Sequence, residues 1–135
     1  MATWISTHGI GAITDTDSSF TITAASGSAL VKPGNSGQLS GWIHYTIPDP
    51  PATNPSLITL AVDFASQSAF VQDVAIYLAN VEKFKRTNLQ RGQSFEESIV
   101  DQKVVYNGKG IMVSIKVEFE NMGSSLRFQS IGIKV

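Results

Sequence analysis

Residues 111–120 read IMVSIKVEFE, and this stretch decides the fold class. Every second side chain is apolar, and all the residues between them except Met112 are polar or charged. Successive side chains of a β-strand point to opposite faces, so the pattern predicts one strand with a buried face and a solvated face. The expected inward row is Ile111, Val113, Ile115, Val117 and Phe119.

The same two-residue period recurs along most of the chain, and turn residues separate the apolar runs. The clearest turns are Lys32-Pro33-Gly34-Asn35 and Pro48-Asp49-Pro50-Pro51. We therefore predict an all-β fold, an antiparallel β-sandwich of jelly-roll or Greek-key type with about eight to ten strands. Residues 1–135 are expected to form a single β-sandwich domain, because this length is typical of one domain.

Two local patterns give more specific predictions. The dipeptide Asn107-Gly108 lies between the run Ile99–Tyr106 and residues 111–120, which predicts two strands joined by a type I′ hairpin turn. Residues 86–96 are polar and contain a glycine, so we predict a loop there. Phe95–Ser98 is the one segment where we allow a helical turn.

In the last predicted strand, Leu126–Val135, the alternation of apolar and polar residues shifts by one position. Its apolar positions have one parity up to Phe128 and the other parity from Ile131 onward. Both sets can face the core only if one extra residue is absorbed, so we predict a β-bulge near Gln129 and Ser130.

Composition excludes several classes of function. The net charge is −1 and the pI is about 6.1, so the chain lacks the basic surface that nucleic acid requires. It has no cysteine, and no stretch is long enough to span a membrane. The first residues contain no basic region and no apolar run. We expect a cytoplasmic protein, one exported without a visible signal peptide, or a mature fragment with an added Met.

Charge is distributed unevenly along the chain. Residues 1–62 carry only Asp15, Asp17, Lys32 and Asp49, whereas the other 17 of the 21 charged residues follow. Such a charge-poor half can be a contact surface for a sugar or another subunit, since short side chains lose little entropy on burial. It can also be an ordinary solvated β surface, in which Thr is simply a good strand former. We favour the second interpretation.

The richest stretch for recognition is Trp42-Ile43-His44-Tyr45-Thr46-Ile47-Pro48-Asp49-Pro50. Strand periodicity places Trp42, His44 and Thr46 on one face. If that face is exposed, the indole suits the apolar side of a pyranose and the imidazole suits a hydroxyl, so the candidate ligand-binding residues are Trp42, His44 and Asp49. If it is buried, Trp42 packs in the core beside a satisfied His44. We favour burial, because aromatic-rich strands are mostly core.

Catalytic and metal-binding patterns are weak. Nucleophile-elbow and phosphate-loop sequences are absent, and His8 and His44 are the only histidines, without metal-ligand spacing. Asp15-Thr16-Asp17 resembles the start of a calcium loop, but the required Gly and terminal Glu are missing. We predict no catalytic residue, no metal site and no cofactor.

The stretch from Trp42 to Pro50 resembles a family of small, uncharacterised microbial β-sandwich domains that share a Trp-x-His-x-x-Ile-Pro-x-Pro sequence. Val74-Ala75-Ile76-Tyr77, Gly110–Ile115 and Gln129-Ser130-Ile131-Gly132 are also similar, so the likeness covers residues 40–135. The resemblance implies the sandwich fold and no established activity.

We therefore expect a binding module rather than an enzyme. Its partner would be a carbohydrate or another ligand such as a protein, with no nucleic acid and no membrane involved. The alternative is a structural protein that forms a homo-oligomer through its charge-poor N-terminal half.

Overall fold

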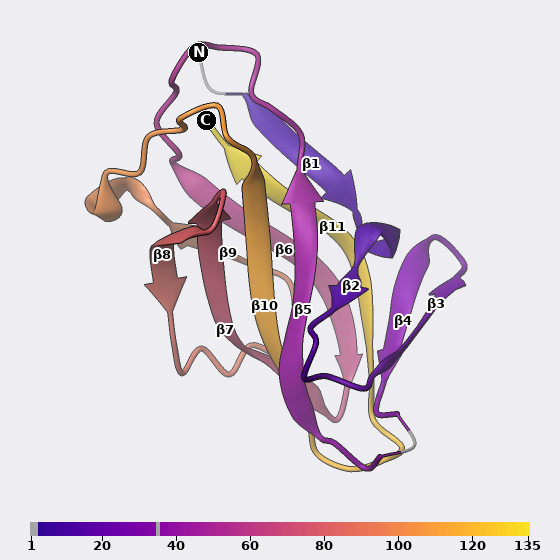
Figure 1. The fold of residues 1–135 in the computed structure, drawn as a ribbon. Coiled ribbons are helices and arrows are strands. Elements are labelled where there is room, and N and C mark those ends of the chain that lie inside the picture. Colours follow the sequence, from indigo (N-terminus) through magenta and orange to yellow (C-terminus); the bar gives the residue numbers. More distant parts are fainter. Residues whose placement is uncertain (1–2, 35) are drawn as a thin grey trace.

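The computed structural model describes residues 3–34 and 36–135 and arranges their eleven strands in two antiparallel sheets, one in front of the other in Figure 1. In spatial order, sheet A contains β3 (Thr21–Ala25), β4 (Ser28–Lys32), β11 (Ser125–Lys134), β6 (Thr59–Gln67) and β9 (Phe95–Ser98), and β1 (Trp4–His8) also pairs with β11. Sheet B contains β2 (Ile13–Thr14), β5 (Ser40–Ile47), β10 (Ile111–Phe119), β7 (Ala69–Leu78) and β8 (Val81–Arg86).

The chain crosses between the sheets repeatedly. From β4 to β7 each successive strand lies in the opposite sheet, and β9, β10 and β11 alternate in the same way. This connectivity confirms the predicted antiparallel sandwich of jelly-roll type. Across the described residues the helical segments are two short 3₁₀ turns, and none is long and apolar enough to cross a bilayer.

The core lies between the sheets, and β10 contributes its centre. All five residues of the predicted inward row are buried, as the alternation requires. Tyr45 of β5 is also fully buried, and its hydroxyl donates a hydrogen bond to the Gly9 carbonyl oxygen at 3.0 Å. Burial raises the pKa of this phenol. The hydrogen bond offsets the cost of placing a polar group in the core.

The predicted hairpin at Asn107-Gly108 is wrong. The preceding segment contains a 3₁₀ turn (Val100–Gln102) and only an isolated bridge at Val105, while β10 pairs with β5 and β7. A type I′ turn needs a positive φ at both central residues. The structure describes both Asn107 and Gly108, and only Gly108 has a positive φ (78°), so the turn is not type I′. The Asn107 side chain accepts a hydrogen bond from the Lys109 N–H, which is the local turn chemistry of asparagine.

Two other local predictions have opposite outcomes. Phe95–Ser98 is strand β9 and not a helical turn, because it pairs with β6 from Val62 to Thr59 and extends sheet A. The β-bulge is confirmed, since the pairing of β11 with β6 shifts between Phe128 and Ser130 and leaves Gln129 outside the register.

Candidate functional site

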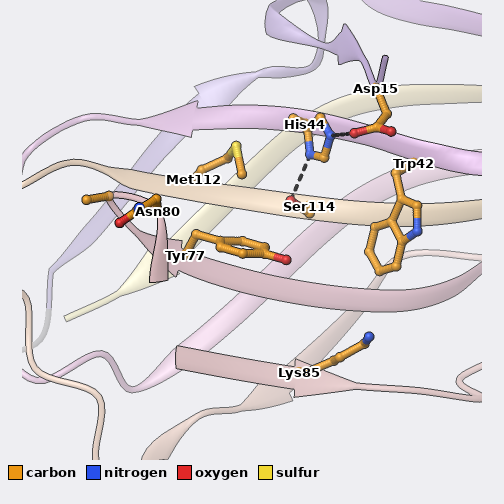
Figure 2. A pocket seen from close by; sticks show the side chains of 9 residues that line it. Asp15, Trp42, His44, Tyr77, Asn80, Lys85, Met112 and Ser114 are labelled. Atoms are coloured by element: carbon orange, nitrogen blue, oxygen red, sulfur yellow. Dashed lines mark hydrogen bonds and ion pairs between the residues drawn. The ribbon is translucent and has the colours of Figure 1, made fainter. Parts of the chain in front are cut away.

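The outer face of sheet B contains a hollow of about 530 Å³. Four strands or their ends surround it: β5, β10, β7 and β8, with the segment after β2 at one side. Its lining residues, shown in Figure 2, are Asp15, Trp42, His44, Tyr77, Ala79, Asn80, Lys85, Met112 and Ser114.

The floor of the hollow follows from cross-strand register. Ser114 in β10 is paired with His44 in β5 and with Ala75 in β7, and Ala75 is paired with Lys85 in β8. Paired residues share a face of the sheet, so these four side chains form one row across it. The two central members are the smallest, which lowers the middle of the face.

The cross-strand rows on either side of this floor row supply the side chains that form the walls of the hollow. On one side Trp42 is paired with Lys116, and on the other Tyr77 is paired with Met112. Figure 2 shows Trp42 toward one end of the hollow and Tyr77 with Met112 toward the other. The Nζ atom of Lys85 lies 5.6 Å from the centroid of the Trp42 ring, within the range of a cation–π contact.

The structure corrects the expectation that Trp42 packs in the core. Ile43 and Tyr45 occupy the inward positions of β5 and are fully buried, so Trp42 and His44 point outward and are only partly buried. The physical reason is the alternation itself, because only one of the two parities of β5 can face sheet A. The other half of that interpretation holds, since both ring nitrogens of His44 have partners.

A hydrogen-bond chain runs along one wall of the hollow. His44 Nε2 lies 2.7 Å from Asp15 Oδ1, and His44 Nδ1 lies 2.7 Å from Ser114 Oγ. A carboxylate can only accept, so with neutral imidazole Nε2–H donates to Asp15, and Ser114 donates its hydroxyl proton to Nδ1. The hydrogen bond from His44, together with the backbone N–H of Asp17, lowers the pKa of the Asp15 carboxyl.

The Asp15–His44–Ser114 hydrogen-bond chain superficially resembles a nucleophilic triad, but the surroundings of Ser114 suit binding better. Ser114 lies in the middle of a strand that is paired on both sides, so the backbone N–H groups near it bond within the sheet. A triad needs free donors beside the nucleophile to stabilise an oxyanion. What the chain achieves instead is a fixed orientation for the His44 ring and the Ser114 hydroxyl.

Asp49, the third candidate from the sequence, lies outside the hollow. It follows β5 in a loop, where its carboxylate accepts a hydrogen bond from the Tyr106 hydroxyl. That bond raises the pKa of Tyr106, whose oxygen also accepts from the Gly110 N–H. Asp49 therefore ties the loop after β5 to the segment before β10.

Sequence reasoning missed most of the hollow. Strand periodicity did place Ser114 on the face opposite the inward row, but nothing marked it as a partner of His44. Asp15 was noted only as part of a sequence that resembles the start of a calcium loop, and Tyr77 only as part of the family resemblance. Nothing linked either of them or Lys85 to Trp42 and His44, because these residues reach the site through tertiary pairing. Among residues 3–34 and 36–135, no group of three or more His, Asp or Glu side chains could hold a metal ion.

Comparison with solved structures supports the fold. No protein-family model and no curated protein matches the chain. Among solved structures, CBM29_1, a family 29 carbohydrate-binding module from Piromyces equi, has a TM-score of 0.55 at 7% identity, covering 98% of this chain and 90% of the module. A variant of a family 29 module has a TM-score of 0.54 at 11% identity, covering 99% and 92%.

A third similar structure is a variant of CBM29-2 described as complexed with cellulohexaose. Its TM-score is 0.53 at 12% identity, and the match covers 98% of this chain and 91% of that one. At identities this low, these likenesses show the β-sandwich fold and nothing about the site.

Proposed function

We propose that the domain is a non-catalytic carbohydrate-binding module and that the hollow on sheet B is its binding site. The observation that carries the proposal is the pair of outward-facing aromatic side chains, Trp42 and Tyr77, on either side of a floor that is small at its centre. A pyranose has apolar C–H faces and a rim of hydroxyls. An amphipathic ring at each end and polar groups between them complement that shape.

The polar groups suit a polyhydroxyl ligand. Asp15 is a carboxylate acceptor at one side, and Asn80 and Lys85 supply donors at the rim. Ser114 is buried on the floor, where it orients His44. Because Asp15, His44 and Ser114 already hold one another in place, little side-chain entropy is lost when a ligand arrives.

The test begins with a glycan array and continues with calorimetry on the best ligand. A β-1,4-linked glucan such as cellohexaose is a sensible first probe, since a structure of similar fold is described with cellulohexaose. The parent chain is compared with Trp42→Ala and Tyr77→Ala. Met122→Ala, an exposed apolar residue in the turn between β10 and β11, serves as the matched control.

The expected size of the effect follows from contact area. A sugar that covers ~60 Å² of indole and hides a similar area of its own gains about 3 kcal/mol at ~25 cal/mol per Å². Trp42→Ala should therefore weaken binding about 100-fold, while Met122→Ala should leave it unchanged. Unchanged affinity in a folded Trp42→Ala variant, or an array with no bound glycan, would refute the proposal.

The non-catalytic part is tested separately. The parent chain and Ser114→Ala are incubated with an activated ester, and hydrolysis is followed by absorbance. We expect no hydrolysis that depends on Ser114. A serine-dependent rate above that of the buffer would show that the Asp15–His44–Ser114 chain activates a nucleophile.

A further inference from the structure

A second hollow lies on the opposite side of the molecule, on the outer face of sheet A. Its volume is about 340 Å³, and it spans four strands: β1, β11, β6 and β9. The residues that line it are Trp4, Ser6, Ala61, Asp63, Glu96, Ser130 and Gly132.

This hollow repeats the plan of the first. Ser6, Gly132, Ala61 and Glu96 are paired in that order, so three small residues form the floor and Glu96 closes one end. Gly132 has no side chain, which keeps the floor low where β11 lies next to Ser6 and the Trp4 ring. A Cβ there would lie 3.3 Å from the Ser6 Cβ, which is a tight contact, and 3.5 Å from the Trp4 ring, which is an ordinary one, so a side chain at this position would occupy the floor beside the indole.

Trp4 provides an apolar platform beside this floor. It is 45% exposed, although an indole is a side chain that folding usually covers much more fully. The chain has only two tryptophans, and each lies in one of the two hollows on opposite outer faces. Position on the strand explains the exposure, because Ile5 takes the inward position of β1 and turns Trp4 outward.

The charges differ from those of the first hollow. Asp63 and Glu96 are exposed, and within residues 3–34 and 36–135 neither carboxylate has an ion pair or a side-chain hydrogen bond. Lys134 is paired with Trp4 and Arg127 is paired with Ala65, so β11 places two positive charges on the same outer face as the two carboxylates, but neither positive residue lines the hollow. His8 is paired with Ser130. In the first hollow, by contrast, Lys85 lies over the tryptophan ring, and the carboxylate among the lining residues, Asp15, is already bonded to His44.

We propose that the hollow on sheet A is a second sugar-binding site, selective for protonated amino sugars, and that the domain is therefore bivalent. The ring of the sugar stacks on Trp4, and its ammonium group lies against Asp63 and Glu96. A cation near both an indole and carboxylates gains cation–π attraction and charge-assisted hydrogen bonds. Neutral sugars gain only the stacking, and uronic acids are repelled.

The two tryptophans allow each site to be observed separately. The ¹⁵N-labelled chain is titrated with a glucosamine oligosaccharide at mildly acidic pH, and both indole N–H resonances are followed. The N-acetylated oligosaccharide and a galacturonate oligosaccharide are the comparison probes. Trp4→Ala and Trp42→Ala assign the two resonances.

In the parent chain, the Trp4 resonance should move saturably as the glucosamine probe is added. Asp63→Asn and Glu96→Gln should each bind the probe threefold to tenfold more weakly, which is the effect on affinity of about one charge-assisted contact. Glu118→Gln, an exposed carboxylate on β10, is the matched control and should change nothing. Neither surface variant removes a core side chain, so both should fold even if Trp4→Ala does not.

Three outcomes would overturn the inference: a Trp4 resonance that does not move at millimolar glucosamine probe, equal affinity for the N-acetylated or galacturonate probe, or full affinity in both carboxylate variants. The proposed function of the first hollow is judged on the Trp42 resonance alone. A failure at one site therefore remains distinguishable from a failure at the other.

Discussion

Replacing Ile115 with Ala is the most direct test of how the sandwich supports its two faces. Ile115 is fully buried in the middle of β10, where it is paired with Ile43 of β5 and Val74 of β7. The substitution removes three carbon atoms, worth about 2.4 kcal/mol of transfer free energy at ~0.8 kcal/mol each. The cavity left between two paired strands adds to this, so we expect a loss of about 3–4 kcal/mol in the free energy of unfolding.

The loss can be measured by urea unfolding, followed by circular dichroism, with an unchanged m value. In a thermal melt the unfolding entropy of the 135-residue chain is ~0.28 kcal/mol/K, so the midpoint should fall by about 10–14 °C. Lys116→Ala is the control, since its side chain points outward from the adjacent position. It should change stability by less than about 1 kcal/mol.

Equal losses in the two variants would show that the alternation in β10 does not separate a core face from an outer face. That result would also undermine the first hollow, because Ser114 belongs to the outer face by the same alternation.

Three further predictions concern a turn, the charge-poor half and acid stability. Gly108→Val should cost about 1 kcal/mol or more, because φ is 78° there and a β-branched residue is strained in that region although no atom lies within 4 Å of a new Cβ; an unchanged urea midpoint would contradict this. If the charge-poor half mediates self-association, lysines at both Thr21 and Thr23, exposed on the edge strand β3, should break the oligomer and leave the fold intact; light scattering that shows a monomeric parent chain would end this idea. Asp15→Asn should abolish a pH-dependent part of stability, because His44 lowers the Asp15 pKa in the folded state. That part is fully present above the ordinary carboxyl pKa of about 4 and is lost as pH falls through the lower folded value. The urea midpoints of parent and variant, compared at neutral pH and at about pH 3, should therefore converge in acid; a gap that stays constant would refute the assignment.

The elements that local pattern predicted well are those where burial is encoded within a few residues. Strand β10 follows from its alternation, and the bulge in β11 follows from the change of parity after Phe128. The hairpin prediction was wrong because the dipeptide Asn107-Gly108 indicates a tight turn but does not identify the partner of the following strand. That strand, β10, pairs with β5 and β7 and not with the segment before the turn.

The same division applies to the candidate site. Strand periodicity alone determined that Trp42 and His44 share a face, because side chains two apart in a strand always do. Whether that face lies inside or outside required the tertiary structure, in which Tyr45 fills the core. Only the fold could bring the partners of His44 together, since Asp15 is 29 residues away and Ser114 is 70 residues away. Their approach is set by the order of strands in the sheet, and strand order depends on long-range packing that no short stretch of sequence contains.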